Sequence, residues 1–147
     1  MFSGRFDHAI DEKGRVSIPA RFREKLSAAD FLYVTNFRSD RQPCLRLYTP
    51  DEWDRLLGRL KQKPSFNPDI QRFQLFFIGG AHDVPIDVQG RILIPPKLRE
   101  FARLERDVTF SGMSEHFELW DRDTLNKVLE KAEATFDDPE RMKEIDL

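Results

Sequence analysis

The sequence lacks most features that mark a disulfide-bonded, secreted or membrane-spanning protein. Its 147 residues include one cysteine, Cys44, so no disulfide can form within the chain, and a lone cysteine is most often inert packing. No run of apolar residues approaches the roughly 20 that a helix needs to cross a membrane. The first five residues also lack the apolar region of a signal peptide. These absences predict a cytoplasmic protein in a reducing compartment.

Motifs for catalysis, cofactor binding and metal binding are missing too. The chain has no glycine-rich phosphate loop, no GxSxG nucleophile motif and no HExxH zinc motif. Its histidines, His8, His82 and His116, are scattered together with Cys44 and show no ligand spacing. We therefore expect no enzyme activity, no cofactor and no metal site.

Net positive charge is also absent, although nucleic-acid-binding domains are usually basic. The formal charge of the whole chain is −2. Residues 130–147 hold seven acids and three bases, a net charge of −4, which leaves +2 for residues 1–129. The distribution predicts a mildly basic body followed by an acidic C-terminal tail, although a run of charges is usually only a solvated face.

The chain does contain an internal duplication. Residues 11–24, DEKGRVSIPARFRE, return as DVQGRILIPPKLRE at residues 87–100, with a constant offset of 76. In each copy an aspartate and a glycine bracket a tight turn, because aspartate accepts bonds from nearby backbone N–H groups and glycine readily adopts a positive φ. A short strand, a proline and a short amphipathic helix follow each turn.

The surrounding pattern extends this duplication into two similar units. Residues 5–10 alternate as a strand that we expect to pair with 15–18 across the turn. Further strands are expected in pairs at residues 31–37 with 44–48, and 107–111 with 116–120. Capped helices are expected after Thr49 and Asp121. The predicted fold class is therefore α+β, with two β-α-β-β-α repeats.

These patterns also predict how the chain is divided. The expected segments are a first repeat at 1–61, a linker and connecting helix at 62–79, a second repeat at 80–132 and an acidic tail at 133–147. Each repeat alone is near or below the roughly 60 residues at which a separate core becomes marginal. The two repeats should therefore pack as one body about a pseudo-twofold axis.

The doubled turn supplies the candidate functional residues. Asp11 and Arg15 flank the first turn, and Asp87 and Arg91 flank the second. Each pair could be an exposed ion pair worth only ~0.2–1 kcal/mol. Two guanidinium groups at one pole of a twofold body would instead suit phosphate oxygens or guanine, with an aspartate fixing the direction of each. A catalytic carboxylate dyad is disfavoured, because each aspartate has an arginine four residues on that keeps it ionised.

The doubled motif resembles that of the MraZ family, bacterial regulators associated with the division and cell-wall gene cluster. The similarity runs nearly end to end and includes Asn67-Pro68 and the FELW segment at residues 117–120. The resemblance implies a pseudo-dimeric, swapped-hairpin, AbrB-like β-barrel flanked by helices. It also implies a ring-shaped homo-oligomer and sequence-specific binding to direct repeats of double-stranded DNA in the promoter of the protein's own operon.

The resemblance implies a repressor associated with the nucleoid, with the following DNA-binding residues, the last two being weaker candidates: Arg15, Arg91, Asp11, Asp87, Lys13 and Arg5. Two alternatives remain open. In one, the arginines hold subunits of an assembly module together; in the other, the chain is an antitoxin-like partner protein. The sequence departs from the family pattern at Leu75, where a second arginine is expected, and at Leu125, where a tryptophan is common.

Overall fold

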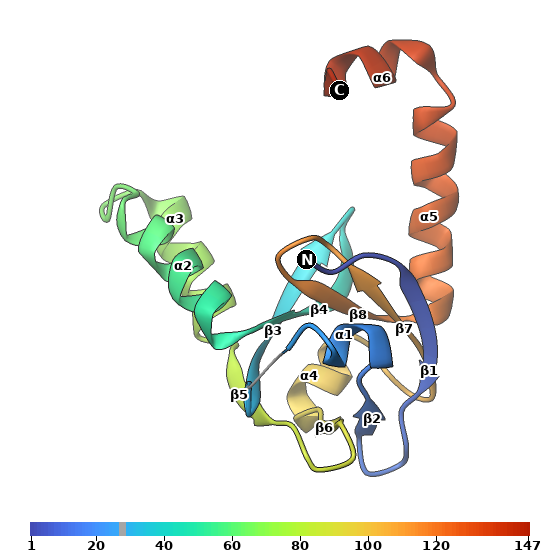
Figure 1. Cartoon of the computed structure of the whole chain (residues 1–147). Coiled ribbons are helices and arrows are strands. Elements are labelled where there is room, and N and C mark those ends of the chain that lie inside the picture. The colour runs from blue at the N-terminus through green and yellow to red at the C-terminus, as the bar shows by residue number, and fades with distance from the viewer. Residues whose placement is uncertain (27–28) are drawn as a thin grey trace.

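The computed structural model describes residues 1–26 and 29–147, which form two repeats joined by a helical linker (Figure 1). The first repeat consists of β1 (Arg5–Ala9), β2 (Arg15–Ser17), α1 (Ala20–Arg23), β3 (Phe31–Ser39), β4 (Gln42–Tyr48) and α2 (Pro50–Lys61). The linker consists of α3 (Pro68–Phe73) and the π-helix η1 (Gln74–Ile78). The second repeat consists of β5 (His82–Pro85), β6 (Arg91–Leu93), α4 (Pro96–Phe101), β7 (Asp107–Gly112), β8 (Phe117–Asp121) and α5 (Arg122–Phe136), and α6 (Pro139–Ile145) follows. Each repeat therefore has the order ββαββα, in which the two strands that flank the turn both precede the first helix.

The strands on either side of each turn pair with the other repeat, so the expected pairing of residues 5–10 with 15–18 is wrong. β1 pairs with β7, β5 pairs with β3, and β2 pairs with β6, all antiparallel. At the base of the first turn the Asp11 N–H donates to the Arg15 carbonyl at 2.9 Å. Beyond this bond β1 and β2 separate, and each pairs with a strand of the other repeat. Pairing between repeats lets two units that are each too small for a stable core share one.

The strand register preserves the 76-residue offset of the duplication. The Ala9–Asp107 pair corresponds under that offset to the Pro85–Phe31 pair. The β2–β6 ladder maps onto itself, with Val16 opposite Ile92 at its centre. The two repeats are therefore related by a local twofold axis that passes between β2 and β6.

The strands form two sheets. One has six strands in the order β1-β7-β8-β4-β3-β5, and the other is the β2–β6 ribbon. Within the described part of the chain, no pairing joins the edge strands β1 and β5. The backbone hydrogen bonds observed there do not close the expected barrel.

One hydrophobic core joins both repeats. Phe22 of α1 packs on Phe117 of β8 with ring centroids 4.8 Å apart, and each is 1% exposed or less. Leu26 and Leu98 are also buried, as the amphipathic pattern predicts. Burial of a side chain of this size stabilises a fold by about 1.5–3 kcal/mol. The core therefore holds both turn-and-helix segments against the same body.

Two helical arms leave this body in different directions (Figure 1). The first arm is formed by α2, α3 and η1. At its root, Trp53 stacks on Tyr33 and Phe77, with ring centroids 5.0 and 5.5 Å apart. Thr49 caps α2 as predicted, because its side-chain oxygen accepts the Glu52 N–H at 3.3 Å.

The second arm is formed by α5 and α6. Asp121 caps α5 as predicted, since its carboxylate accepts the Thr124 N–H at 3.0 Å. Leu125 packs at the root of the arm with Cys44 and Trp120. α5 continues to Phe136 and so crosses the residue at which the acidic tail was expected to begin. No described helix has the length and apolar character required to cross a membrane.

Candidate nucleic-acid interface

The first turn is organised by the carboxylate of Asp11. Its Oδ1 accepts the N–H groups of Lys13 and Arg15 at 2.9 and 2.8 Å, and its Oδ2 accepts Nε–H of Arg15 at 2.8 Å. Gly14 completes the turn with φ of +91° and donates its N–H to the Asp11 carbonyl at 2.9 Å. The aspartate thus shapes the turn and fixes the direction of the guanidinium through Nε, and its bond to Arg15 does not use the Nη groups.

The second turn repeats the first atom for atom. Oδ1 of Asp87 accepts the N–H groups of Gln89 and Arg91, both at 2.9 Å, and Oδ2 accepts Nε–H of Arg91 at 3.0 Å. Gly90 has φ of +75°. The same local sequence therefore produces the same guanidinium support twice.

Backbone bonds across the local twofold hold the two turns together. The Ile18 N–H donates to the Gly90 carbonyl at 2.9 Å, and the Ile94 N–H donates to the Gly14 carbonyl at 2.8 Å. Because both bonds come from regular backbone next to the β2–β6 ribbon, they keep the turns at a fixed separation.

Arginines of the short helices brace the opposite turns. Arg23 donates through Nη1 to the Gln89 carbonyl at 3.3 Å, and Arg99 lies so close to Gly14 that a Cβ there would be 2.6 Å from its Nε. On the sequence alone these two arginines are candidates for extra phosphate contacts only. Their bracing role escapes sequence reasoning because it joins residues of different repeats.

The β2–β6 ribbon has one buried and one outward face. Val16 and Ile92 are each 1% exposed, so their side chains form the buried face. Because side chains alternate along a strand, Arg15 and Arg91 both lie on the outward face. They are diagonal neighbours across the two strands, a relation that typically separates Cα atoms by roughly 7–8 Å. Their side chains are 38% and 33% exposed. The structure thus brings both predicted arginines to one face, outside the core and at the same end of the body.

The two halves of this face are not identical. The strand register sets Leu93 opposite Arg15 and Ser17 opposite Arg91. Leu93 is 54% exposed, although the rest of the face is polar. The difference between Ser17 and Leu93 is visible when the two copies are aligned in the sequence. Only the β2–β6 strand register shows which arginine lies opposite each of them.

The electrostatics of the turns favour charged side chains. The bond from the Arg15 N–H is the largest cause that lowers the pKa of Asp11, and the Arg91 N–H does the same for the pKa of Asp87. Two carboxylates that are both ionised cannot share a proton as a catalytic dyad. Residues 11–26 have five bases and three acids, and 87–103 have four bases and two acids, so these segments together carry +4 in a chain of −2.

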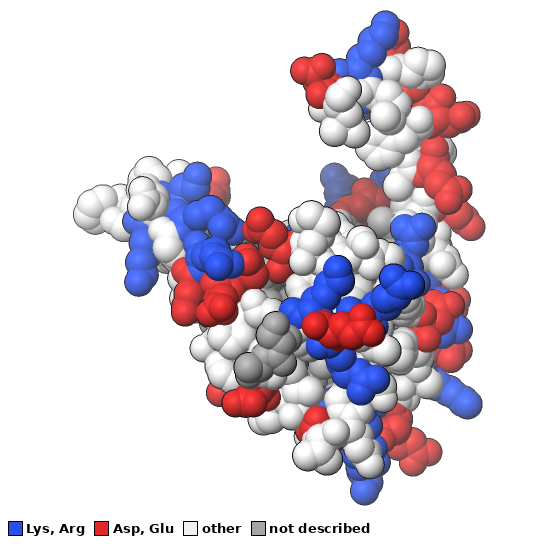
Figure 2. Space-filling model, in the orientation of Figure 1, with Lys and Arg blue, Asp and Glu red and all other residues white. Residues whose placement is uncertain are grey.

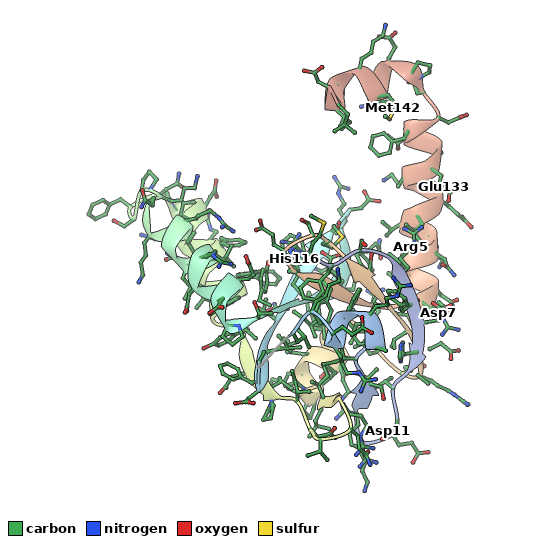
Figure 3. The ribbon with its side chains drawn as sticks, in the orientation of Figure 1. Arg5, Asp7, Asp11, His116, Glu133 and Met142 are labelled. Atoms are coloured by element: carbon green, nitrogen blue, oxygen red, sulfur yellow. The ribbon has the colours of Figure 1, made fainter. Side chains whose placement is uncertain are left out.

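The weaker candidates Lys13 and Arg5 lie in different places. Lys13 is exposed at the tip of the first turn. Arg5 begins β1 and lies far from Asp11 (Figure 3), six residues or roughly 20 Å of extended strand away. The structure therefore groups Lys13 with the two aspartates and two arginines, and it does not bring Arg5 to them.

Comparison with known proteins assigns the chain to a family. The profile of the MraZ protein family, also described as antitoxin-like, matches residues 1–76 and again residues 77–145. The chain belongs to the MraZ family. The resemblance seen in the doubled motif is confirmed, and the two matches meet inside η1.

A curated MraZ relative supports the same assignment. The chain is 42% identical over 148 residues to the protein called transcriptional regulator MraZ of Heliobacterium modesticaldum, and the match covers 100% of both chains. The solution structure of PHS018 from Pyrococcus horikoshii is a much weaker likeness, with a TM-score of 0.35 and 16% identity, covering 78% of this chain and 84% of that one.

Proposed function

We propose that this member of the MraZ family is a transcription regulator, mainly a repressor, that binds double-stranded DNA through the outward face of the β2–β6 ribbon. The observation that carries the proposal is the fixed pair of guanidinium groups on that face, each held by its own aspartate at 2.8 and 3.0 Å. The major groove of B-DNA admits a two-stranded β-ribbon, and arginine pairs with O6 and N7 of guanine. Arg15 and Arg91 would therefore read bases.

The charge around the ribbon supports contacts to the DNA backbone. Lys13, Arg21 and Lys97 are exposed on the two segments that carry the net charge of +4. Contacts of lysine and arginine with phosphates position a protein on the duplex without reading its sequence. In this proposal these residues supply affinity, and the two paired arginines supply specificity.

The protein's DNA target and its assembly into a ring complete the proposed function. The DNA is the promoter of the protein's own operon in the division and cell-wall gene cluster, with direct repeats as binding sites, so the protein acts at the nucleoid. Several copies with a swapped-hairpin, AbrB-like fold form a ring. Each copy is only mildly basic, so simultaneous engagement of tandem repeats by linked copies would supply avidity. No catalysis and no cofactor take part.

The alternative function is that of an assembly module, in which the same arginines hold subunits together. It gives Arg15 and Arg91 a protein partner instead of DNA. Both readings need the arginines exposed and fixed, so the two are separated by measuring DNA binding and subunit assembly on the same variants.

The test uses Arg15→Ala, Arg91→Ala and the matched control Arg72→Ala, whose side chain is 76% exposed on α3. Binding to a duplex of the protein's own promoter is measured by fluorescence anisotropy at fixed salt, with analytical ultracentrifugation and thermal melting alongside. Loss of a bidentate base contact costs ~1–3 kcal/mol, so each ribbon variant should bind roughly 5–150-fold more weakly, while its melting temperature and assembly remain unchanged. Wild-type affinity in Arg15→Ala refutes the proposal, and lost assembly with retained DNA binding favours the alternative.

A further inference from the structure

Exposed large apolar side chains are concentrated on the two helical arms. The first arm exposes three, namely Phe66, Leu75 and Phe76. The second arm and the residues after it expose four, namely Phe136, Met142, Ile145 and Leu147. Scattered single apolar residues are normal on a protein surface, whereas a concentration on two projecting elements is typical of interaction sites.

The first arm contains a groove with apolar walls and cationic edges. The groove has a volume of about 820 Å³ and is lined by Leu56, Leu60 and Phe73 together with Arg55, Arg59 and Lys63. Arg55 pairs with Glu52 on the same helix. Within residues 1–26 and 29–147, Arg59 and Lys63 form no ion pair. Figure 2 shows basic side chains gathered over α2, with acidic side chains next to them toward the body.

The second arm has the complementary character. The bend between α5 and α6 brings Phe136, Met142 and Asp137 onto one open surface; Lys143 also lines this surface but pairs with Glu140. Glu133 lies one turn before Asp137 on α5, and in the described part of the chain neither of these acids has an ion-pair partner. Acidic side chains line the edge of this arm in Figure 2. Exposed apolar residues with acids beside them match a groove of apolar residues with bases beside it.

The two arms of a single chain leave the body in different directions (Figure 1). Each is held at its root by buried aromatic or aliphatic side chains, the first by Trp53 and the second by Leu125. Because both roots are packed into the body, one copy presents its groove and its acidic arm in different directions. The two surfaces are therefore placed to engage different neighbours.

We propose that the α5–α6 arm of one copy docks into the α2–α3 groove of a second copy of this chain. Phe136 and Met142 enter the groove beside Leu56, Leu60 and Phe73, while Glu133 and Asp137 face Arg59 and Lys63. Each copy uses two different surfaces, so the contact is heterologous and repeats from copy to copy until a ring closes. The inference supplies the contact behind the proposed assembly, and it does not depend on DNA reading by the ribbon.

A charge exchange tests this contact in the full-length protein. The groove variant carries Arg59→Glu and Lys63→Glu, and the arm variant carries Glu133→Lys and Asp137→Lys. All four side chains are exposed, so these changes leave the core untouched. Assembly is measured by sedimentation velocity and light scattering for the wild type, for each variant alone, for a 1:1 mixture and for the chain with all four changes. Lys127→Ala, near the root of α5, is the surface control.

The expected result is that the wild type assembles and that each variant alone assembles on the order of 100-fold more weakly, because like charges then meet at the contact. The 1:1 mixture should recover assembly with equal numbers of both variants, since every groove again meets an arm of opposite charge. The chain with four changes should also recover it. A monomeric wild type, variants that assemble normally, or a mixture of folded variants that stays monomeric would each overturn the contact. DNA binding by the variants is measured separately, so failure of one proposal leaves the other standing.

Discussion

The conformation of Gly14 allows a quantitative test of how the reading face is held. Its φ of +91° is a backbone conformation that residues other than glycine rarely adopt. A Cβ added at Gly14 would lie 2.6 Å from Nε of Arg99. The positive φ alone costs about 1–2 kcal/mol for an alanine. The contact adds to this cost, because Nε of Arg99 donates to the Ile94 carbonyl at 3.1 Å and would have to shift. We therefore expect Gly14→Ala to destabilise the protein by at least about 1–2 kcal/mol and to lower its melting temperature by at least roughly 3 °C.

The same chain contains a matched control at Gly58. This glycine lies inside α2 on the wall of the groove, and an added Cβ there would meet no atom within 4 Å beyond the neighbouring backbone of its own helix. Gly58→Ala should stabilise the protein by about 0.5–1 kcal/mol, because alanine restricts the unfolded chain and favours helix. Urea unfolding at one protein concentration, followed by circular dichroism, measures both changes. A Gly14→Ala variant as stable as the wild type, or two changes of the same sign, would refute the reasoning.

Three further predictions concern charge and burial. Lys13→Ala should weaken DNA binding about equally on all sequences and reduce the slope of log affinity against log salt by about 0.9, as measured by anisotropy; an unchanged slope would exclude a phosphate contact. The carboxyl of Asp11 should titrate below the ordinary pKa of about 3.9, so its stabilising effect is present above that pH and is lost as pH falls through the lower value. Because the Arg15 N–H is the main cause, the NMR titration midpoint should stay low in Arg15→Ala, and a return to the ordinary value would contradict this. Burial raises the pKa of the Cys44 thiol, so a thiol reagent at pH 8 should label it only after unfolding, and rapid labelling of the native protein would disagree.

The turns could be predicted from the sequence because their chemistry is local. Asp11 bonds to groups two and four residues on, and Gly14 supplies the positive φ within the same turn. The same holds for the cap at Thr49, three residues from the N–H that it binds. Interactions of this range depend on a few neighbouring residues, so the sequence pattern contains them in full.

The strand partners could not be predicted in the same way. Alternation shows that a segment is a strand with one buried face, and it does not name the strand beside it. Residues 5–10 have the pattern of a local hairpin arm, yet β1 pairs with β7, about a hundred residues along the chain. The assumption of a local hairpin also concealed the bracing of each turn by Arg23 and Arg99, which come from the other repeat.

The pairing of Leu93 with Arg15 and of Ser17 with Arg91 has a consequence for orientation. A perfectly symmetric face would fit a duplex equally well in either direction and would suit a palindrome. This face couples one arginine to an aliphatic side chain and the other to a hydroxyl, so turning the protein end for end would exchange chemically distinct contacts. On DNA bound as proposed, such a face has a preferred polarity, and successive sites pointing the same way would suit it better than mirror-related ones.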